Sequence, residues 1–177
     1  MLRQIKRKAG IDMYFHQSDV LQGLEKDFLK KFMEITKRET FKSGHALYKE
    51  GDRADHFFIL LNGRIKISIG ETGHVVYTVD RAGEFFGWSS LVGRDKYAAS
   101  AECIETAMLL RIDVGELNRL LEKDAPAGLI LYRNLSASLG KRLLQTYRLI
   151  PGMGLTDMSR SYGTGQLQES DVNASLS

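Results

Sequence analysis

The residues best suited to chemistry lie in the stretch GEFFGWSSLVGRDKYAASA, residues 83–101. It opens with the pair Gly83-Glu84 and closes on a run of small residues. Glycine and alanine leave room for an anion to approach backbone N–H groups. A glutamate there would accept hydrogen bonds from sugar hydroxyls, while an arginine would neutralise a phosphate. The stretch therefore fits either a cradle for a small anionic ligand or a turn that a β-rich core requires.

Metal and catalytic centres find no support in the residue types. Cys103 is the only cysteine, which excludes intrachain disulfides, cysteine-based zinc sites and four-cysteine iron–sulfur clusters. The four histidines are scattered singly and lack the spacing of a metal-dependent β-roll enzyme. No Ser-His-Asp or paired-carboxylate arrangement has local support. We therefore expect no enzyme activity and no metal site; a sensor that holds haem through one or two histidines stays open.

Composition and charge indicate one cytoplasmic domain. The chain has 177 residues, of which 43% are hydrophobic, enough for a sizeable core and a helical appendage. The formal charge of +3 is too small to indicate a nucleic-acid binder. The sequence contains neither a signal-peptide core nor an apolar run of about 18 residues. We therefore expect a cytoplasmic protein without membrane contact.

Helices and strands must position this stretch, and the spacing of apolar residues predicts where they lie. The spacing is helical first, then typical of strands, then helical again. Residues 1–35 read as a helical lead-in that is interrupted near Gly23. From residue 36 to 112 short strands follow one another without intervening helices, which indicates antiparallel pairing. Asn62-Gly63 predicts a tight type I′ hairpin, because both of its central positions need positive φ. The predicted fold class is mainly β, a jelly-roll-like antiparallel β-roll with flanking helices.

Two neighbouring segments alternate like half-buried strands. Ile65, Ile67 and Ile69 alternate with polar residues, which predicts that all three isoleucines face the core. The segment GETG at 70–73 predicts a turn into a further alternating strand at 74–80.

The last part of the pattern is helical again. Asp113 and Glu116 form a capping-box pattern at the start of one helix, and Pro126 suits the first turn of a second. Leucines at four-residue intervals extend the second helix over about 24 residues, or about 36 Å. Its apolar stripe predicts a homodimer through residues 127–150. The predicted organisation is a lead-in at 1–35, a β-roll ligand-binding domain at 36–112, helices including the dimer helix at 113–150, and a flexible tail at 151–177.

The sequence resembles the cyclic nucleotide-binding domain family over roughly residues 15–150. The likeness is carried by FKSGHALYKEGDRADHFFILLNGRIKI and by AGEFFGWSSLV followed by YAASA. The first segment resembles the family's first strands, with turn glycines at Gly44, Gly51 and Gly63. The second resembles the phosphate-binding cassette, which runs Gly-Glu, a short helical turn, and Arg before small residues. The family includes the sensor domains of catabolite activator-type regulators and of protein kinase A regulatory subunits, and the resemblance implies a β-roll with a dimer helix.

The resemblance also implies roles for the cassette residues. Glu84 would accept the ribose 2′-hydroxyl. Tyr97 stands where the family has arginine, and a neutral phenol offers one donor where a guanidinium offers five. Arg94 or Lys96 would then supply the missing charge, unless these loop cations are simply solvated.

On the long helix, Thr146 and Tyr147 match the positions that reach the base in the family. Alternatively, Thr146 faces solvent and Tyr147 lies in an interface. Phe85 and Phe86 fit packing in the core or the cassette better than a platform that stacks on a ligand. The predicted ligand-binding residues are Gly83, Glu84, Phe85, Phe86, Arg94, Lys96, Tyr97, Ala98, Ala99, Ser100, Thr146 and Tyr147.

Two functions remain open. The first is a regulatory sensor that binds a cyclic nucleotide or another small anionic ligand and signals through the dimer helix, without a typical cyclic AMP site. The second is a degenerate domain that serves as a dimerisation or docking scaffold without ligand. Glu84 favours the first, because an unpaired buried carboxylate is costly, and Tyr97 favours the second. No helix-turn-helix pattern follows residue 150, so direct DNA binding is not expected, and the downstream protein partner is unknown.

Overall fold

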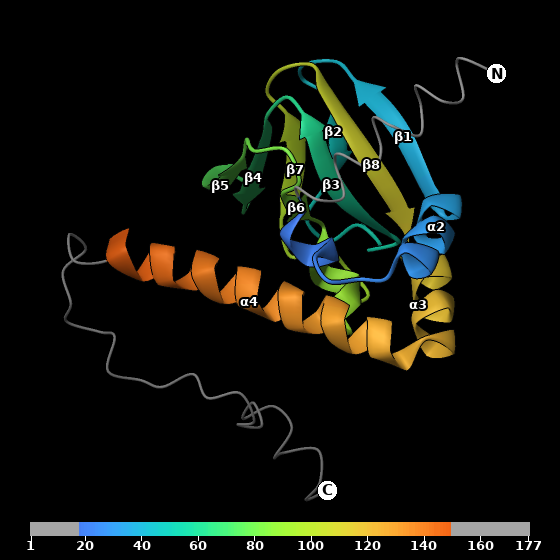
Figure 1. Cartoon of the computed structure of the whole chain (residues 1–177). Helices are drawn as coiled ribbons and strands as arrows, with labels where there is room; N and C mark the ends of the chain where they lie inside the picture. The colour runs from blue at the N-terminus through green and yellow to red at the C-terminus, as the bar shows by residue number, and fades with distance from the viewer. Residues whose placement is uncertain (1–17, 150–177) are drawn as a thin grey trace, which may run out of the picture. The chain divides into compact units, whose positions relative to one another are not determined.

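The computed structural model describes residues 18–149, which form two four-stranded antiparallel sheets with helices before and after them (Figure 1). The predicted fold class is confirmed. The predictions for residues 1–17 and 150–177 lie outside the described residues. The strands are β1 (Thr36–Phe41), β2 (Ala46–Tyr48), β3 (His56–Asn62), β4 (Ile65–Ile69), β5 (His74–Val79), β6 (Phe85–Phe86), β7 (Ser100–Cys103) and β8 (Ala107–Asp113). The helices are η1 (Asp19–Leu21), α2 (Lys26–Glu34), η2 (Trp88–Val92), α3 (Val114–Lys123) and α4 (Ala125–Leu149).

The strand order gives the fold its roll topology. One sheet has the order β1-β8-β3-β6 and the other β2-β7-β4-β5, so the chain crosses repeatedly between the sheets. The pair β1–β8 runs in register from Thr36 opposite Ile112 to Phe41 opposite Ala107. Strands far apart in sequence therefore lie side by side.

The hairpin predicted at Asn62-Gly63 is wrong. The strands before and after it, β3 and β4, belong to different sheets. Gly63 has φ +100°, but no non-glycine residue of the described chain has positive φ, which excludes a type I′ turn at Asn62. A Cβ on Gly63 would lie 2.6 Å from the Cα of Ala107. Glycine is needed here because β8 approaches closely, not because the chain reverses on itself.

The alternation predicted for the next strand holds only in part. β4 pairs with β5 across the turn at 70–73, as predicted, and Gly73 N–H donates to Gly70 O at 3.0 Å. The register shifts between Ile67, opposite Tyr77, and Ser68, opposite Val75, so the unpaired residue of the bulge is Val76 on β5. Ser68 is buried, whereas Ile69 is 42% exposed. The prediction that Ile69 faces the core is wrong, because β4 ends at Ile69 beside the turn to β5.

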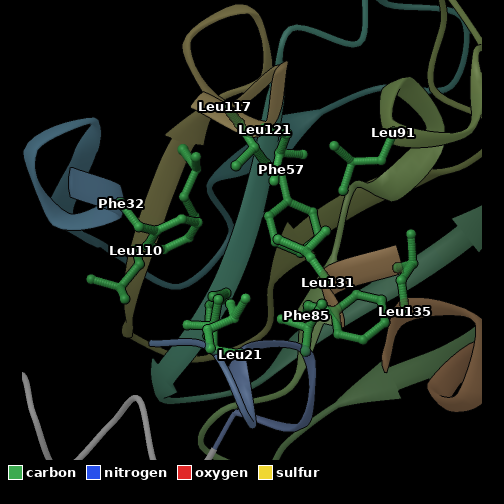
Figure 2. Packing of buried hydrophobic residues seen from close by; sticks show 14 of the residues in the cluster. Leu21, Phe32, Phe57, Phe85, Leu91, Leu110, Leu117, Leu121, Leu131 and Leu135 are labelled. Atoms are coloured by element: carbon green, nitrogen blue, oxygen red, sulfur yellow. The ribbon is translucent and has the colours of Figure 1, made fainter. Parts of the chain in front are cut away.

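One apolar core lies between the β1-β8-β3-β6 sheet and the helices (Figure 2). Phe57 and Leu110 come from the sheet, Leu117 from α3, and Leu131 and Leu135 from α4. Burying a large apolar side chain stabilises the fold by about 1.5–3 kcal/mol. The helices that precede and follow the strands in sequence are therefore held by a shared core rather than by local propensity.

Sequence signals at the helix starts agree with the structure. Asp113 Oδ1 accepts the Glu116 backbone N–H at 2.8 Å, which confirms the Asp113 half of the predicted capping box at the start of α3. α4 begins at Ala125 with Pro126 in its first turn, where Asp124 Oδ1 accepts the Ala127 N–H at 3.1 Å.

A second core lies between the two sheets. It is rich in aromatic rings, including Tyr48, Phe58, Phe86 and Tyr97. β3 is buried on both faces, because its alternate residues belong to the two cores. This second core adjoins the cassette stretch and decides what space is left there.

The chain divides into two compact units, Met1–Leu139 and Gly140–Ser177, and α4 crosses the boundary. In the described part of the second unit Leu143 is 51% exposed, and Leu144 and Tyr147 are exposed to a similar degree. The predicted domain limits stay predictions. Among the described residues no helix is both long and apolar enough to cross a membrane.

Candidate functional site

The cassette stretch consists of a short strand, a helical turn and a loop. β6 is followed by Gly87 and η2, and Gly93 ends that turn. Both glycines are left-handed, with φ 72° and 80°. A Cβ on Gly87 would lie 2.9 Å from the Phe58 ring, so only glycine fits. Leu91 then anchors η2 in the first core (Figure 2).

The carboxylate of Glu84 is held by its own neighbours. Tyr77 Oη donates to Oε1 at 2.6 Å, and Arg81 Nη2 lies 3.2 Å from the same oxygen. The backbone N–H groups of Asp80 and Arg81 donate to Oε2 at 3.2 and 3.0 Å. Burial alone would disfavour the charged carboxylate, but these hydrogen bonds outweigh it and lower the pKa of Glu84.

These contacts leave Glu84 little capacity for a ligand. An ionised carboxylate has about four acceptor positions, and four donors already reach it. A ribose hydroxyl would have to displace one of them. The predicted role of Glu84 stays a prediction, but the cost of its burial is already met by Arg81 and Tyr77.

The position of η2 suggests a second alignment of the cassette. In the family pattern the Gly-Glu pair directly precedes the helical turn. Here Gly83 and Glu84 precede β6, whereas the residues at the start of the turn are Gly87 and Trp88. In this alignment an indole occupies the place of the acid. The sequence alone does not reveal this alignment, because Gly83 and Gly87 lie only four residues apart. The position of the helical turn shows which of them matches the cassette glycine.

Tyr97 is buried in the second core. Its ring stacks on Tyr48, with centroids 3.7 Å apart and planes at 15°. Its hydroxyl donates to His56 O at 2.7 Å and accepts from His56 N–H at 3.1 Å. Burial raises the pKa of Tyr97 to about 12, so the phenol is neutral. The side chain at the cassette-arginine position is thus a packed, fully hydrogen-bonded core residue.

The small residues after Tyr97 are also in use. Ala98 N–H donates to Ser89 Oγ at 3.2 Å, and Ser100 Oγ accepts the Glu50 N–H at 2.9 Å. Phe85 and Phe86 are 1% and 2% exposed, one in each core. Ala99 is half-buried and Gly83 is buried.

The predicted cations lie together at the surface. Arg94 and Lys96 are exposed and line a hollow of about 540 Å³ with Arg53, Asp55 and other residues. No salt bridge of Arg94 or Lys96 occurs within residues 18–149, whereas Arg53 pairs with Asp55 at 2.8 Å. The structure thus brings the two cations together, but Glu84 does not line their hollow.

Thr146 and Tyr147 lie in the second unit. Both are exposed, and Thr146 Oγ1 donates to Arg142 O at 3.0 Å within the helix. Their predicted contact with a base stays a prediction.

Sequence reasoning missed a cavity of about 220 Å³ in the first unit. It is lined by Phe41, His45, Leu47, Tyr48, Asp52, Arg53, His56, Phe58, Tyr97 and Arg111. No local signal could have found it, since its walls come from segments spread over 71 positions of sequence, from Phe41 to Arg111. Within the described residues, no group of three or more His, Cys, Asp or Glu side chains could hold a metal ion.

The family model described as "Cyclic nucleotide-binding domain" matches residues 38–124. Residues 38–124 therefore form a domain of the cyclic nucleotide-binding domain family. The resemblance seen in the sequence is thereby confirmed, and the chain carries a domain of a regulatory, sensor-like family.

Relatives of this domain occur in larger proteins. The cGMP-dependent protein kinase egl-4 of Caenorhabditis elegans is 25% identical over 120 residues, covering 64% of this chain and 15% of that protein. The cAMP-bound structure of PfPKA-R is 26% identical, with TM-score 0.63, over 81% of this chain and 48% of that one. Thermus thermophilus catabolite activator protein shares the fold at 20% identity, with TM-score 0.61, over 75% and 62%. The chain spans only 12% to 18% of the curated relatives it matches.

Proposed function

We propose that this chain carries a non-enzymatic regulatory domain that acts as a dimerisation or docking module and does not hold a cyclic nucleotide through the family's cassette contacts. The proposal keeps the regulatory role of the family and changes the mechanism. A cytoplasmic location stays an expectation.

The conformation of Tyr97 carries this proposal. Its ring is stacked on Tyr48 and its hydroxyl is hydrogen-bonded to both backbone groups of His56. A nucleotide phosphate would find neither a guanidinium nor a free donor on this side chain. Each charge-assisted hydrogen bond contributes about 1.5–3 kcal/mol, so loss of a bidentate arginine weakens binding by about two orders of magnitude or more.

Calorimetric titration with cyclic AMP and cyclic GMP tests the proposal. We expect no saturable heat for either nucleotide up to about 1 mM. Submicromolar binding of either one would overturn it. The double variant Arg94→Ala, Lys96→Ala is the matched comparison: tight binding that disappears in it would assign the phosphate to these loop cations.

The second candidate function is a sensor for another small anion. One observation favours it: Arg94 and Lys96 share a hollow and form no salt bridge in the described part of the chain. Binding of a nucleotide that needs both cations would therefore support the sensor rather than the scaffold.

The output surface in this proposal is a homodimer through residues 127–150. Exposed apolar side chains on α4 supply the contact, including Leu143, Leu144 and Tyr147 in the second unit. Leu131 and Leu135, the first leucines of the predicted stripe, are buried in the first core, so a second copy would contact the exposed apolar residues instead. Sedimentation of the full chain should show a dimer that Leu143→Glu with Tyr147→Glu converts to a monomer; an unchanged sedimentation coefficient would contradict this interface.

A further inference from the structure

Aromatic and imidazole rings line the 220 Å³ cavity together with charged side chains. Tyr48 and Tyr97 stack with centroids 3.7 Å apart. Phe41 and the His45 imidazole stack at 4.7 Å and 23°. Aromatic faces favour planar partners, either stacked or edge to face. An engineered cavity of about 150 Å³ accepts benzene, so this one has room for a single ring with a small substituent.

The polar group best placed to orient a ligand is Arg111. Its Nη2 lies 3.0 Å from Glu39 Oε1, and this is its only salt bridge within the described residues. Its Nε is buried without a hydrogen-bond partner. A guanidinium has five N–H donors, so Arg111 retains donors for an oxygen acceptor in the cavity.

The charges around the cavity do not favour an ion. Arg111 is offset by Glu39, and Arg53 by Asp55 at 2.8 Å. Asp52 adds a further carboxylate to the lining, where its Oδ2 accepts the Lys49 N–H at 2.8 Å. An anion in the cavity would therefore meet the Asp52 carboxylate, and two guanidinium groups that already pair with Glu39 and Asp55 outside the lining.

His56 does not change this balance near neutral pH. Burial and the neighbouring Arg111 lower the pKa of its imidazole, against the opposing effect of Asp113, Asp55 and Glu39. His56 thus contributes a neutral ring to the lining.

We propose that this cavity binds a small, uncharged, planar aromatic molecule that presents a carbonyl oxygen to Arg111. The ligand would touch Tyr97 and so contact the cassette directly, which gives the domain a regulatory input that needs no cyclic nucleotide. This site shares Arg53 with the hollow of Arg94 and Lys96 but includes neither of those two cations, so it stands or falls independently of the function proposed above.

Benzamide is the probe for this proposal, followed by amide NMR spectra of the full ¹⁵N-labelled chain. We expect saturable shifts at the residues that line the cavity, with a dissociation constant of about 1 mM. Benzoate has nearly the same shape with a charge, and it should bind at least about tenfold more weakly because of Asp52, Glu39 and Asp55. Cyclohexanecarboxamide keeps the acceptor but not the flat ring, and it should also bind more weakly.

Two variants locate the site. Leu47→Trp fills the cavity from its wall and should abolish the benzamide shifts, whereas Val76→Trp on the exposed face of β5 should leave them unchanged. Arg111→Gln keeps a donor but loses the guanidinium, and should weaken benzamide by about threefold to tenfold. Arg111→Gln also tests the location of the site if Leu47→Trp does not fold.

Three results would overturn the proposal. The first is no saturable shift in the unaltered chain up to about 20 mM benzamide, well above the expected constant. The second is a set of shifts that maps away from the cavity. The third is equal binding of benzoate and benzamide.

Discussion

The two ends of the cassette stretch are stabilised in different ways. At one end Glu84 is bound by Tyr77, Asp80 and Arg81, all within seven residues of it. At the other end Tyr97 is bound by His56, which lies 41 residues away, and by Tyr48, which lies farther still. The first end is a local corner, whereas the second ties the cassette to the interior of the roll. Substitutions at the two ends should therefore differ in how much of the fold they affect.

Tyr97→Ala should have the largest effect. It removes a buried ring and leaves a cavity, so we expect the free energy of unfolding to fall by about 3–5 kcal/mol in urea denaturation. Tyr97→Phe isolates the hydroxyl and should cost about 1–3 kcal/mol, because the His56 N–H and C=O lose their partner.

The control for Tyr97→Ala is Val75→Ala on β5, at a position 54% exposed, where the loss should stay below about 1 kcal/mol. If Tyr97→Ala were no more destabilising than this control, the cassette would not be tied to the roll through its ring.

Gly63, like Tyr97, lies against a residue far away in the sequence, namely Ala107. Gly63→Ala should lower the free energy of unfolding by about 2–4 kcal/mol, because alanine resists φ +100° and its Cβ meets the backbone of Ala107 at 2.6 Å. Gly73 also has positive φ, at +67°, but a methyl group added there would have nothing within 4 Å, so Gly73→Ala should cost only about 1 kcal/mol. Equal losses in thermal melts of the two variants would show that φ alone, and not the close approach of β8, accounts for Gly63.

The same contrast explains what the sequence can and cannot reveal. Signals that act over a few residues predict the structure correctly, such as the Asp113 cap of α3 and the turn at 70–73. The Asn62-Gly63 pair misleads, because a turn signal does not say which sheet the next strand joins. The loss of arginine at Tyr97 is visible in the sequence, but its stacking partner is not, since Tyr48 lies in another part of the chain.

At the candidate site, residue types are predictable and their partners are not. The sequence identifies Glu84 as an acid that needs compensation, and the structure supplies it from Arg81 and Tyr77. The cavity beside Arg111 depends on pairing between distant strands, which no local pattern records.

Glu84→Gln should have a smaller effect than Tyr97→Ala and Gly63→Ala, and a distinctive pH dependence. The amide keeps the shape but loses the charge that four donors reach, so at pH 7 we expect a loss of about 1–2 kcal/mol. The folded-state pKa of Glu84 lies below its ordinary value of 4.5, so the carboxylate stabilises the fold above that value. This contribution disappears as the pH falls below 4.5 and through the folded-state pKa. The difference between the unaltered chain and Glu84→Gln in urea denaturation should therefore shrink with acidification.

Glu71→Gln, at an exposed turn position, is the control and should differ little from the unaltered chain at pH 7 or below pH 4.5. A difference for Glu84→Gln that stays constant from pH 7 to well below 4.5 would mean that the corner is held by shape alone, and the local end of the cassette would then owe nothing to its charge.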